Sequence, residues 1–259
     1  MYFDEIRFHK TKILIFFGSR NCSRHQFKLM KETKENLRTL FLEKRLILSR
    51  TVREESSLAI ANQCLKLPVW GFEYFHLFLP ITKKAEVNTS FVLTLLQARD
   101  KNIVLPKVNS DDSLSSILLT DSTKIIKNKW EIPEPERGIT ITPLMLDVVF
   151  IPLLGYDTFG NRVGYGKGFY DDFLKSCKPN ILKIGLSFFE PIRKIHGIRP
   201  EDITLNYCVT LRGFIIFRYF LHKNFFIKNN HNSHSCTNSS ICNIENILKK
   251  QKSITTYYW

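Results

Sequence analysis

One short segment, residues 157–174 (DTFGNRVGYGKGFYDDFL), constrains the fold of this chain more than any other. It contains four of the eleven glycines in the 259 residues, at positions 160, 164, 166 and 168. Glycines at that density allow positive φ angles and let the backbone approach a bound group closely. An apolar run at residues 146–154 precedes the segment, as is typical of a strand that is covered on both faces. A strand, a glycine-rich turn and a helix in this order predict an α/β fold.

The same segment has the composition of an anion-binding loop. Arg162 and Lys167 lie within it, and successive backbone N–H groups in such a turn can point into one concavity. An acid follows at Asp171 or Asp172, which together with the lysine indicates a nucleotide phosphate and its magnesium ion. Two common phosphate motifs are excluded, because Lys167 precedes a glycine instead of Ser or Thr and the spacing of the glycines does not match a dinucleotide fingerprint. A plain structural turn is the alternative.

The formal net charge of +14 at first favours a nucleic-acid-binding module. The charge is concentrated at the two ends, however. Residues 1–31 hold seven Lys or Arg and two acids, and residues 211–259 hold seven and one. The middle of the chain is therefore only mildly basic, which suits an enzyme with polyanionic ligands. We expect no nucleic-acid partner, and the basic binding module stays as a third interpretation.

Cysteine usage and hydropathy bear on the compartment. None of the six cysteines forms a CxxC pair, and no recognisable signal peptide is present, which favours reduced thiols. No apolar segment is long enough to span a bilayer, and the first ten residues contain acids that a transit peptide avoids. We expect a cytoplasmic monomer without a membrane partner, with an organelle as the alternative location.

The periodicity of the chain predicts alternating strands and helices. Residues 29–57 have helical spacing, and Lys34, Arg38 and Arg45 share one stripe of that helix, for which a solvated basic face is the simplest interpretation. Residues 109–128 indicate a hairpin or an irregular excursion, and residues 130–143 a proline-rich connection. Further helices are expected at 90–99 and 169–176, and strands at 72–79, 103–105, 146–152, 181–188 and 205–210. This order predicts an open, mostly parallel sheet flanked by helices with right-handed crossovers.

Composition divides the chain into three parts. We expect an N-terminal extension at 1–27, a catalytic domain at 28–212 and a low-complexity basic tail at 213–259. The tail is rich in Asn, Ser and Lys, which is typical of disorder. A zinc site formed by His231, His234, Cys236 and Cys242 is a weaker alternative there, because the spacing matches no standard framework.

The run GNRVGYGKGFYD, residues 160–171, resembles the signature of the 5-formyltetrahydrofolate cyclo-ligase family. Shorter stretches resemble other parts of that family in the same order, and the likeness covers roughly residues 31–212. The stretches are KENLR (34–38), FLPITKKAEVNT (78–89), NIVLPKV (102–108), WEIPEP (130–135), DVVFIPLLGYD (147–157) and IHGIRPEDITLNYCVT (195–210). The resemblance implies a NagB/RpiA/CoA-transferase-like fold, here with disordered terminal extensions.

The resemblance also implies an activity: ATP- and Mg²⁺-dependent cyclisation of 5-formyltetrahydrofolate to 5,10-methenyltetrahydrofolate, with release of ADP and phosphate. Reduced folate and ATP would be the small-molecule partners, and Asp171 and Asp202 the metal-site residues. Lys167 and Arg162 would be catalytic. The substrate would contact Glu86, Tyr165, Gly166, Lys167 and Phe169. The ATP site would comprise Lys34, Arg38, Arg162, Val163, Gly164, Tyr165, Gly166, Lys167, Gly168, Phe169 and Tyr170.

The chain departs from the family pattern at two places, and the roles of one residue and of the whole chain have alternatives. The stretch PLLGYD at 152–157 stands where the family has a sequence of the PGLAFD type, and Arg199 stands where the family tends to be acidic or neutral. Trp130 is either a core anchor or part of the pocket wall. The alternative function is another phosphate-ligand enzyme of the same fold, such as a sugar-phosphate isomerase or a CoA-binding protein.

Overall fold

The computed structural model of the chain describes residues 5–8, 11–14 and 32–217. It divides into two units, Met1–Glu32 and Thr33–Trp259. In the first unit, strands β1 (Glu5–Phe8) and β2 (Thr11–Leu14) form an antiparallel pair, so part of the predicted N-terminal extension has regular structure. The predicted tail beyond residue 217, including the alternative zinc site, lies outside the described residues.

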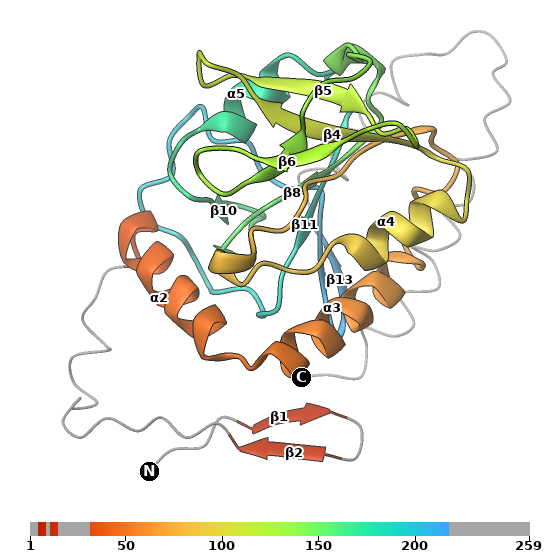
Figure 1. Ribbon diagram of the computed structural model, residues 1–259. Helices are drawn as coiled ribbons and strands as arrows, with labels where there is room; N and C mark the ends of the chain where they lie inside the picture. The colour runs from red at the N-terminus through yellow and green to blue at the C-terminus, as the bar shows by residue number, and fades with distance from the viewer. Residues whose placement is uncertain (1–4, 9–10, 15–31, 218–259) are drawn as a thin grey trace, which may run out of the picture. The chain divides into compact units, whose positions relative to one another are not determined.

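A seven-stranded sheet forms the centre of the second unit (Figure 1). The five inner strands run parallel and the two edge strands antiparallel, which confirms the predicted open, mostly parallel sheet. Every residue of the central strand β8 (VVFI) is buried, as its apolar run predicts. In spatial order the strands are β13 (Gly213–Ile216), β12 (Tyr207–Thr210), β11 (Leu182–Leu186), β8 (Val148–Ile151), β3 (Tyr74–His76), β4 (Asn102–Val108) and β5 (Leu114–Leu118).

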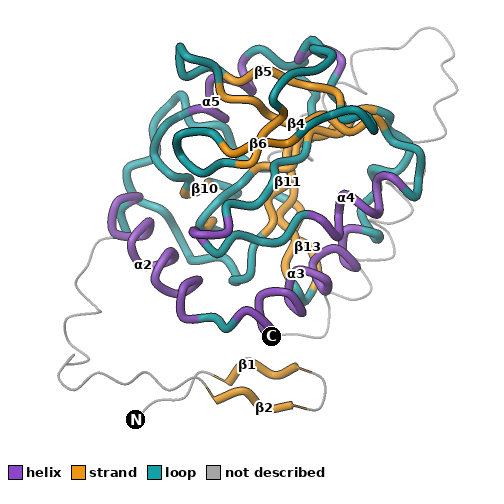
Figure 2. The backbone as a smooth tube through the Cα atoms, viewed as in Figure 1, coloured by secondary structure: helices purple, strands orange, loops and turns teal. Residues whose placement is uncertain are grey.

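Two buried apolar clusters lie on opposite faces of this sheet, because successive side chains of a strand alternate between faces. Phe150 of β8 belongs to the cluster that includes helices α3 (Arg50–Cys64) and α4 (Ser90–Gln97). Its neighbours Val149 and Ile151 belong to the cluster that includes α5 (Phe169–Lys175). The helices on either side of the strands are visible in Figure 2.

The single helical region predicted at 29–57 is two helices. Helix α2 (Lys34–Ile47) is capped at its end by Leu48, and α3 starts afresh because the hydroxyl of Ser49 accepts a hydrogen bond from the Val52 N–H at 3.2 Å. The break sets α2 apart from α3, and α2 contacts β9 (Gly155–Tyr156) and β10 (Arg162–Val163) instead. These two short antiparallel strands carry the chain into the glycine-rich segment.

Two regions differ from the sequence prediction, and a third decides between its two predicted alternatives. Residues 213–216, which were predicted to belong to the tail, form β13, which pairs with β12 and completes the sheet edge. The region 109–128 contributes β5, which forms a hairpin with β4, and this confirms the first of the two alternatives. The proline-rich connection contains β7 (Pro133–Pro135), which pairs with β6 (Ile125–Lys127). Short 3₁₀ turns lie at Thr82–Lys84 and Pro143–Met145.

None of the helices in the described part of the chain has both the length and the apolar character needed to cross a membrane.

Candidate active site

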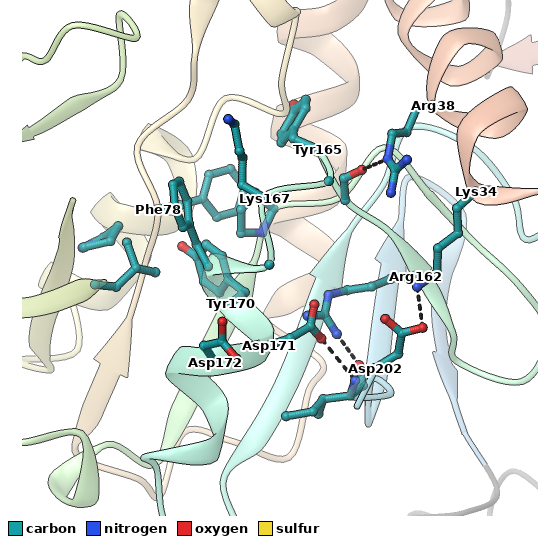
Figure 3. A pocket seen from close by; sticks show the side chains of 18 of the residues that line it. Lys34, Arg38, Phe78, Arg162, Tyr165, Lys167, Tyr170, Asp171, Asp172 and Asp202 are labelled. Carbon is teal, nitrogen blue, oxygen red and sulfur yellow. Dashed lines mark hydrogen bonds and ion pairs between the residues drawn. The ribbon is translucent and has the colours of Figure 1, made fainter. Parts of the chain in front are cut away.

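A cavity of about 790 Å³ opens beyond the carboxyl ends of the parallel strands. Its wall includes Phe78 just after β3, Val108 at the end of β4 and Pro152 just after β8. Ligands of open α/β sheets bind in this position, because the loops that follow the strands converge there. The glycine-rich segment forms much of the remaining wall (Figure 3).

The glycine loop depends on backbone conformations that few other residues adopt. Gly166 has φ +91° and Gly168, the residue before α5, has φ +78°. The preceding turn is held by the buried carboxylate of Asp157, which accepts hydrogen bonds from the backbone N–H groups of Phe159 and Asn161 at 2.9 Å and Ile195 at 3.0 Å. The start of the loop is therefore held by hydrogen bonds, and at Gly166 and Gly168 the backbone faces the cavity without a side chain.

Arg162 and Asp171 form the base of the glycine loop. Arg162 is only 9% exposed; one guanidinium nitrogen donates to the Ile203 carbonyl and another to Asp171 Oδ1 at 2.8 Å. The same carboxylate oxygen accepts the Ile203 N–H at 3.1 Å. These bonds tie the loop to the segment that precedes β12.

Lys34 and Asp202 form a second ion pair in the cavity wall. Asp202 Oδ2 accepts from Lys34 Nζ and from the Arg199 N–H at 2.6 Å. Burial acts to raise the pKa of Asp202, but the hydrogen bonds from Lys34 and the Arg199 backbone, with the charges of Lys34 and Arg162, hold it below its usual value. Asp202 is therefore a carboxylate at neutral pH.

Arg38 and Lys167 differ in how the protein engages them. Arg38 lies on α2 one turn after Lys34, and its Nε donates to the Gly164 carbonyl at 3.1 Å. Lys167 is exposed and has no hydrogen bond or ion pair with any described residue. Figure 3 shows its side chain extending away from the Arg162–Asp171 pair. Its charge is therefore available to a ligand.

Glu86 is 8% exposed and reaches the cavity from the segment after β3. Its Oε1 accepts from the Tyr165 hydroxyl at 2.5 Å and its Oε2 from the Ile81 N–H at 2.7 Å. Burial raises the pKa of Glu86, and the two hydrogen bonds with the charges of Arg45 and Lys84 counteract only part of that rise. Because a carboxylate has about four acceptor positions, each oxygen keeps capacity for one more donor.

Aromatic side chains form the apolar part of the wall. Trp130 and Phe169 both line the cavity, with ring centroids 6.3 Å apart. Of the two alternatives for Trp130, the structure therefore shows the pocket wall. The Tyr170 hydroxyl is buried without a hydrogen-bond partner among the described residues, and burial raises the pKa of Tyr170.

The structure brings nearly all of the sequence-predicted site residues together around this cavity; Val163 is the exception. Its side chain is completely buried and packs with Leu37 and Phe41 of α2. Lys34, Arg38, Glu86, Arg162, Asp171, Asp202 and residues 164–170 all line the cavity.

Sequence reasoning missed two residues. Lys84 lines the cavity and its Nζ lies 4.0 Å from the centre of the Tyr165 ring. Arg45, expected on a solvated stripe, is 1% exposed and donates to the Tyr165 hydroxyl at 3.2 Å. The four-and-seven spacing with Lys34 and Arg38 was a usable signal for Arg45, but it does not say which side of the helix is buried.

The carboxylates suit a hard cation that also binds substrate. Each of Asp171 and Asp202 uses one oxygen in the bonds described above, and the other oxygen has no hydrogen bond or ion pair to a described residue. The described residues contain no cluster of three or more His, Cys, Asp or Glu side chains that could hold a metal. A magnesium ion here would take further ligands from water and phosphate, which is its usual mode of binding.

A protein-family model described as the 5-formyltetrahydrofolate cyclo-ligase family matches residues 30–192. The 5-formyltetrahydrofolate cyclo-ligase of Mus musculus is 30% identical over 157 residues, which are 58% of this chain and 73% of the mouse protein. A probable 5-formyltetrahydrofolate cyclo-ligase of Schizosaccharomyces pombe is 26% identical over 153 residues, 54% of this chain and 74% of that protein.

A solved structure agrees with these matches. The NMR structure of 5,10-methenyltetrahydrofolate synthetase from Aquifex aeolicus superimposes with a TM-score of 0.63 at 25% identity, covering 80% of this chain and 97% of that one. The matched residues include the glycine loop, the acid that follows it and both basic residues of α2 that line the cavity. On these matches, together with the open sheet and the cavity at its carboxyl edge, the chain belongs to the 5-formyltetrahydrofolate cyclo-ligase family.

Proposed function

We propose that this chain converts 5-formyltetrahydrofolate to 5,10-methenyltetrahydrofolate, using ATP and Mg²⁺ and releasing ADP and phosphate. One observation carries the proposal: a glycine loop, with a lysine that pairs with no described residue and two aspartates that each engage one oxygen, shares a cavity with a buried glutamate. The first group of residues suits a nucleotide polyphosphate and the second suits a ligand with paired N–H donors. Family membership supplies the link between the two.

The phosphate side of the cavity consists of the glycine loop and α2. Gly166 and Gly168 present backbone without side-chain bulk, and Lys34, Arg38 and Lys167 line the same wall. We propose that these groups, with Gly164 and the backbone from residue 163 to residue 170, hold the phosphates. Asp171 and Asp202 would hold Mg²⁺, which when bound offsets phosphate charge and orients the transferring group.

The folate side of the cavity is formed by Glu86 and aromatic rings. The pterin ring of a reduced folate carries adjacent N–H donors, and the two free acceptor positions on Glu86 match such a pair. Tyr165, Phe169 and Trp130 provide flat apolar walls next to it. A ring held there would lie beside the glycine loop, and therefore near the phosphates.

The chemistry then needs little from the protein beyond alignment and charge. The formyl oxygen attacks the terminal phosphorus of ATP and ADP leaves; N10 attacks the activated formyl carbon, loses its proton, and phosphate departs as the ring closes. Lys167 would stabilise the negative charge on the transferring group, because it is the cation of the loop that the described protein leaves unpaired. Arg162 would act by holding the base of the loop and Asp171 in place.

The test is the formation of methenyl product by the full chain. The chain is mixed with 5-formyltetrahydrofolate, ATP and Mg²⁺, and the absorbance of 5,10-methenyltetrahydrofolate is followed with release of ADP. Product that requires all three components supports the proposal. Turnover of a sugar phosphate without ATP would instead indicate an isomerase of the same fold.

Location and association stay predictions. We propose a cytoplasmic monomer that binds small molecules and neither nucleic acid nor membranes. The mild charge of residues 32–210, compared with the two ends, supports the nucleic-acid part of this proposal. Size-exclusion chromatography with light scattering, and nucleic-acid binding measured at several salt concentrations, test the two parts.

A further inference from the structure

We propose that Arg45 is a positioning residue of the folate side of the cavity, acting through the Tyr165 hydroxyl on Glu86. This inference rests on the proposed function, because it concerns how the same cavity recognises its reduced-folate substrate. Arg45 does not line the cavity and lies behind Tyr165, so it acts through another side chain and touches no reacting atom.

The first observation is the position of Arg45 at the junction of three segments. It lies in the last turn of α2 and is 1% exposed. One terminal guanidinium nitrogen donates to the Leu153 carbonyl, just after β8, and the other donates to the Tyr165 hydroxyl at 3.2 Å. Arg45 therefore connects the helix, the end of the central strand and the middle of the glycine loop.

The second observation is the direction of the hydrogen bonds. The Arg45 N–H donates to the Tyr165 oxygen, and the Tyr165 O–H donates to Glu86 Oε1 at 2.5 Å. Because a guanidinium has no acceptor, the Tyr165 hydroxyl can accept from Arg45 but cannot donate to it. The hydroxyl therefore donates its hydrogen bond to Glu86. This bond keeps the carboxylate in one orientation and leaves one acceptor position on each oxygen for a ligand.

The third observation is electrostatic. Burial acts against the charged form of Glu86, and the positive charge of Arg45 acts in its favour. Lys84, which lies 4.0 Å from the centre of the Tyr165 ring, adds a second cation that faces the same group from the 3₁₀ turn. Arg45 thus orients Glu86, and its charge favours the ionised form of that carboxyl group.

The fourth observation is the cost of placing an arginine here. A buried charge pays a desolvation penalty that an apolar side chain of similar size would avoid. Phe41, one turn earlier on the same helix and also buried, packs against the apolar side chains of Leu37 and Val163 without that penalty. A charge retained at position 45 is therefore best accounted for by what it does to Tyr165 and Glu86.

The experiment is a double-mutant cycle on substrate binding, without turnover. Calorimetry measures the Kd of 5-formyltetrahydrofolate for the full chain, for R45M, for Y165F and for the double variant. We expect each single change to weaken folate binding about tenfold and the double variant to be little weaker than either, since both remove the same orienting chain. The Kd of an ATP analogue should change less than about twofold in R45M.

The pH dependence of folate binding gives a second readout. In R45M the loss of binding on acidification should begin at a higher pH than in the wild type, because Glu86 has lost a charge that favours its ionised form. Arg45→Lys keeps the charge without the planar fork, so it should restore this pH dependence while restoring less of the affinity. If R45M does not fold, the same comparison is made with R45K.

I60V is the control, since Ile60 is a buried residue of α3 that lies outside the cavity wall and belongs to a different apolar cluster from the one that Tyr165 packs against. It should lower the melting temperature and leave the folate Kd unchanged. Additive losses in the double-mutant cycle, or equal losses of folate and nucleotide affinity in R45M, would overturn the inference. Wild-type chain that binds folate but forms no methenyl product would overturn the proposed function instead, so the two failures are distinguishable.

Discussion

The base and the tip of the glycine loop carry one cation each and use it in opposite ways. At the base, Arg162 is buried and makes hydrogen bonds to the Ile203 carbonyl and to Asp171. At the tip, Lys167 is exposed and pairs with no described residue. Both were predicted to be catalytic from the sequence, where an arginine and a lysine five positions apart look equivalent.

The difference indicates that Arg162 holds the structure of the site, whereas Lys167 acts on the ligand. A buried guanidinium that already donates to two protein groups has fewer N–H donors left for a ligand, and its removal leaves those half-buried partners without that bond. An ammonium group in solvent contributes little to the free energy of unfolding, and its charge can pair with a bound polyanion. The following substitutions, taken from the largest expected effect to the smallest, test whether this division holds.

Lys167→Ala should have the largest effect, and it should be on catalysis alone. Removing one group that stabilises transition-state charge lowers kcat by about 100- to 1000-fold. Because the side chain is exposed and pairs with no residue in the described part of the chain, the free energy of unfolding should change by no more than about 0.5 kcal/mol. Single-turnover kinetics and thermal melting measure the two quantities. A large fall in melting temperature would show that Lys167 has a structural role like that of Arg162.

Arg162→Met should give the opposite profile. The substitution keeps length and removes charge-assisted hydrogen bonds, so we expect a loss of about 2–3 kcal/mol in the free energy of unfolding. Asp171 would lose its charged partner and keep only the Ile203 N–H, and the Mg²⁺ concentration needed for half-maximal rate should change with it. Urea titration and a Mg²⁺ titration of the rate measure both. Unchanged stability would contradict the assignment of Arg162 to the base.

Gly166→Ala tests the connection between base and tip. The backbone there has φ +91°, which costs a side-chain-bearing residue roughly 1–2 kcal/mol, and an added Cβ would lie 3.2 Å from the Arg38 guanidinium carbon. We expect a weaker affinity for an ATP analogue with a modest loss of stability. Gly213→Ala is the control, since that glycine has no neighbour within 4 Å of an added Cβ.

The sequence predicted the parallel sheet and most of the cavity wall because both depend on local patterns. The apolar run of β8 and the glycine spacing after it are readable without tertiary information, and the family resemblance extended the prediction to Lys34, Arg38 and Glu86. The predicted role of Val163 stays a prediction for its backbone alone, because strand alternation in β10 turns its side chain into the core.

Arg45 shows what sequence patterns leave undetermined. Its spacing with Arg38 predicts a shared helix face, but burial depends on what packs over the end of that face. Tyr165 and Leu153 provide the cover, and they are more than one hundred residues away in the chain. The strand at residues 213–216 was missed for the same reason, since β13 is defined by its pairing with β12 and its short apolar sequence does not reveal the partner.

The smallest expected effect concerns Glu86 and the acid limit of folate binding. Burial raises the pKa of Glu86 above the ordinary value of 4.5, so folate affinity should fall on acidification at a higher pH than an exposed glutamate would allow. The folded chain then binds this proton more strongly than the unfolded chain does. The free energy of unfolding should therefore decrease as pH rises from 4.5 through the raised pKa.

Glu86→Gln removes this titration while keeping the shape of the side chain. Relative to the wild type, the variant should bind folate weakly at every pH and lose the decrease in unfolding free energy between pH 4.5 and the raised pKa. Lys167→Ala should keep that pH-dependent decrease in unfolding free energy, because its charge lies at the tip and takes no part in the buried network. If Lys167→Ala altered this pH-dependent decrease as much as Glu86→Gln does, Lys167 and Glu86 would be electrostatically coupled. The phosphate side and the folate side of the cavity would then not be independent.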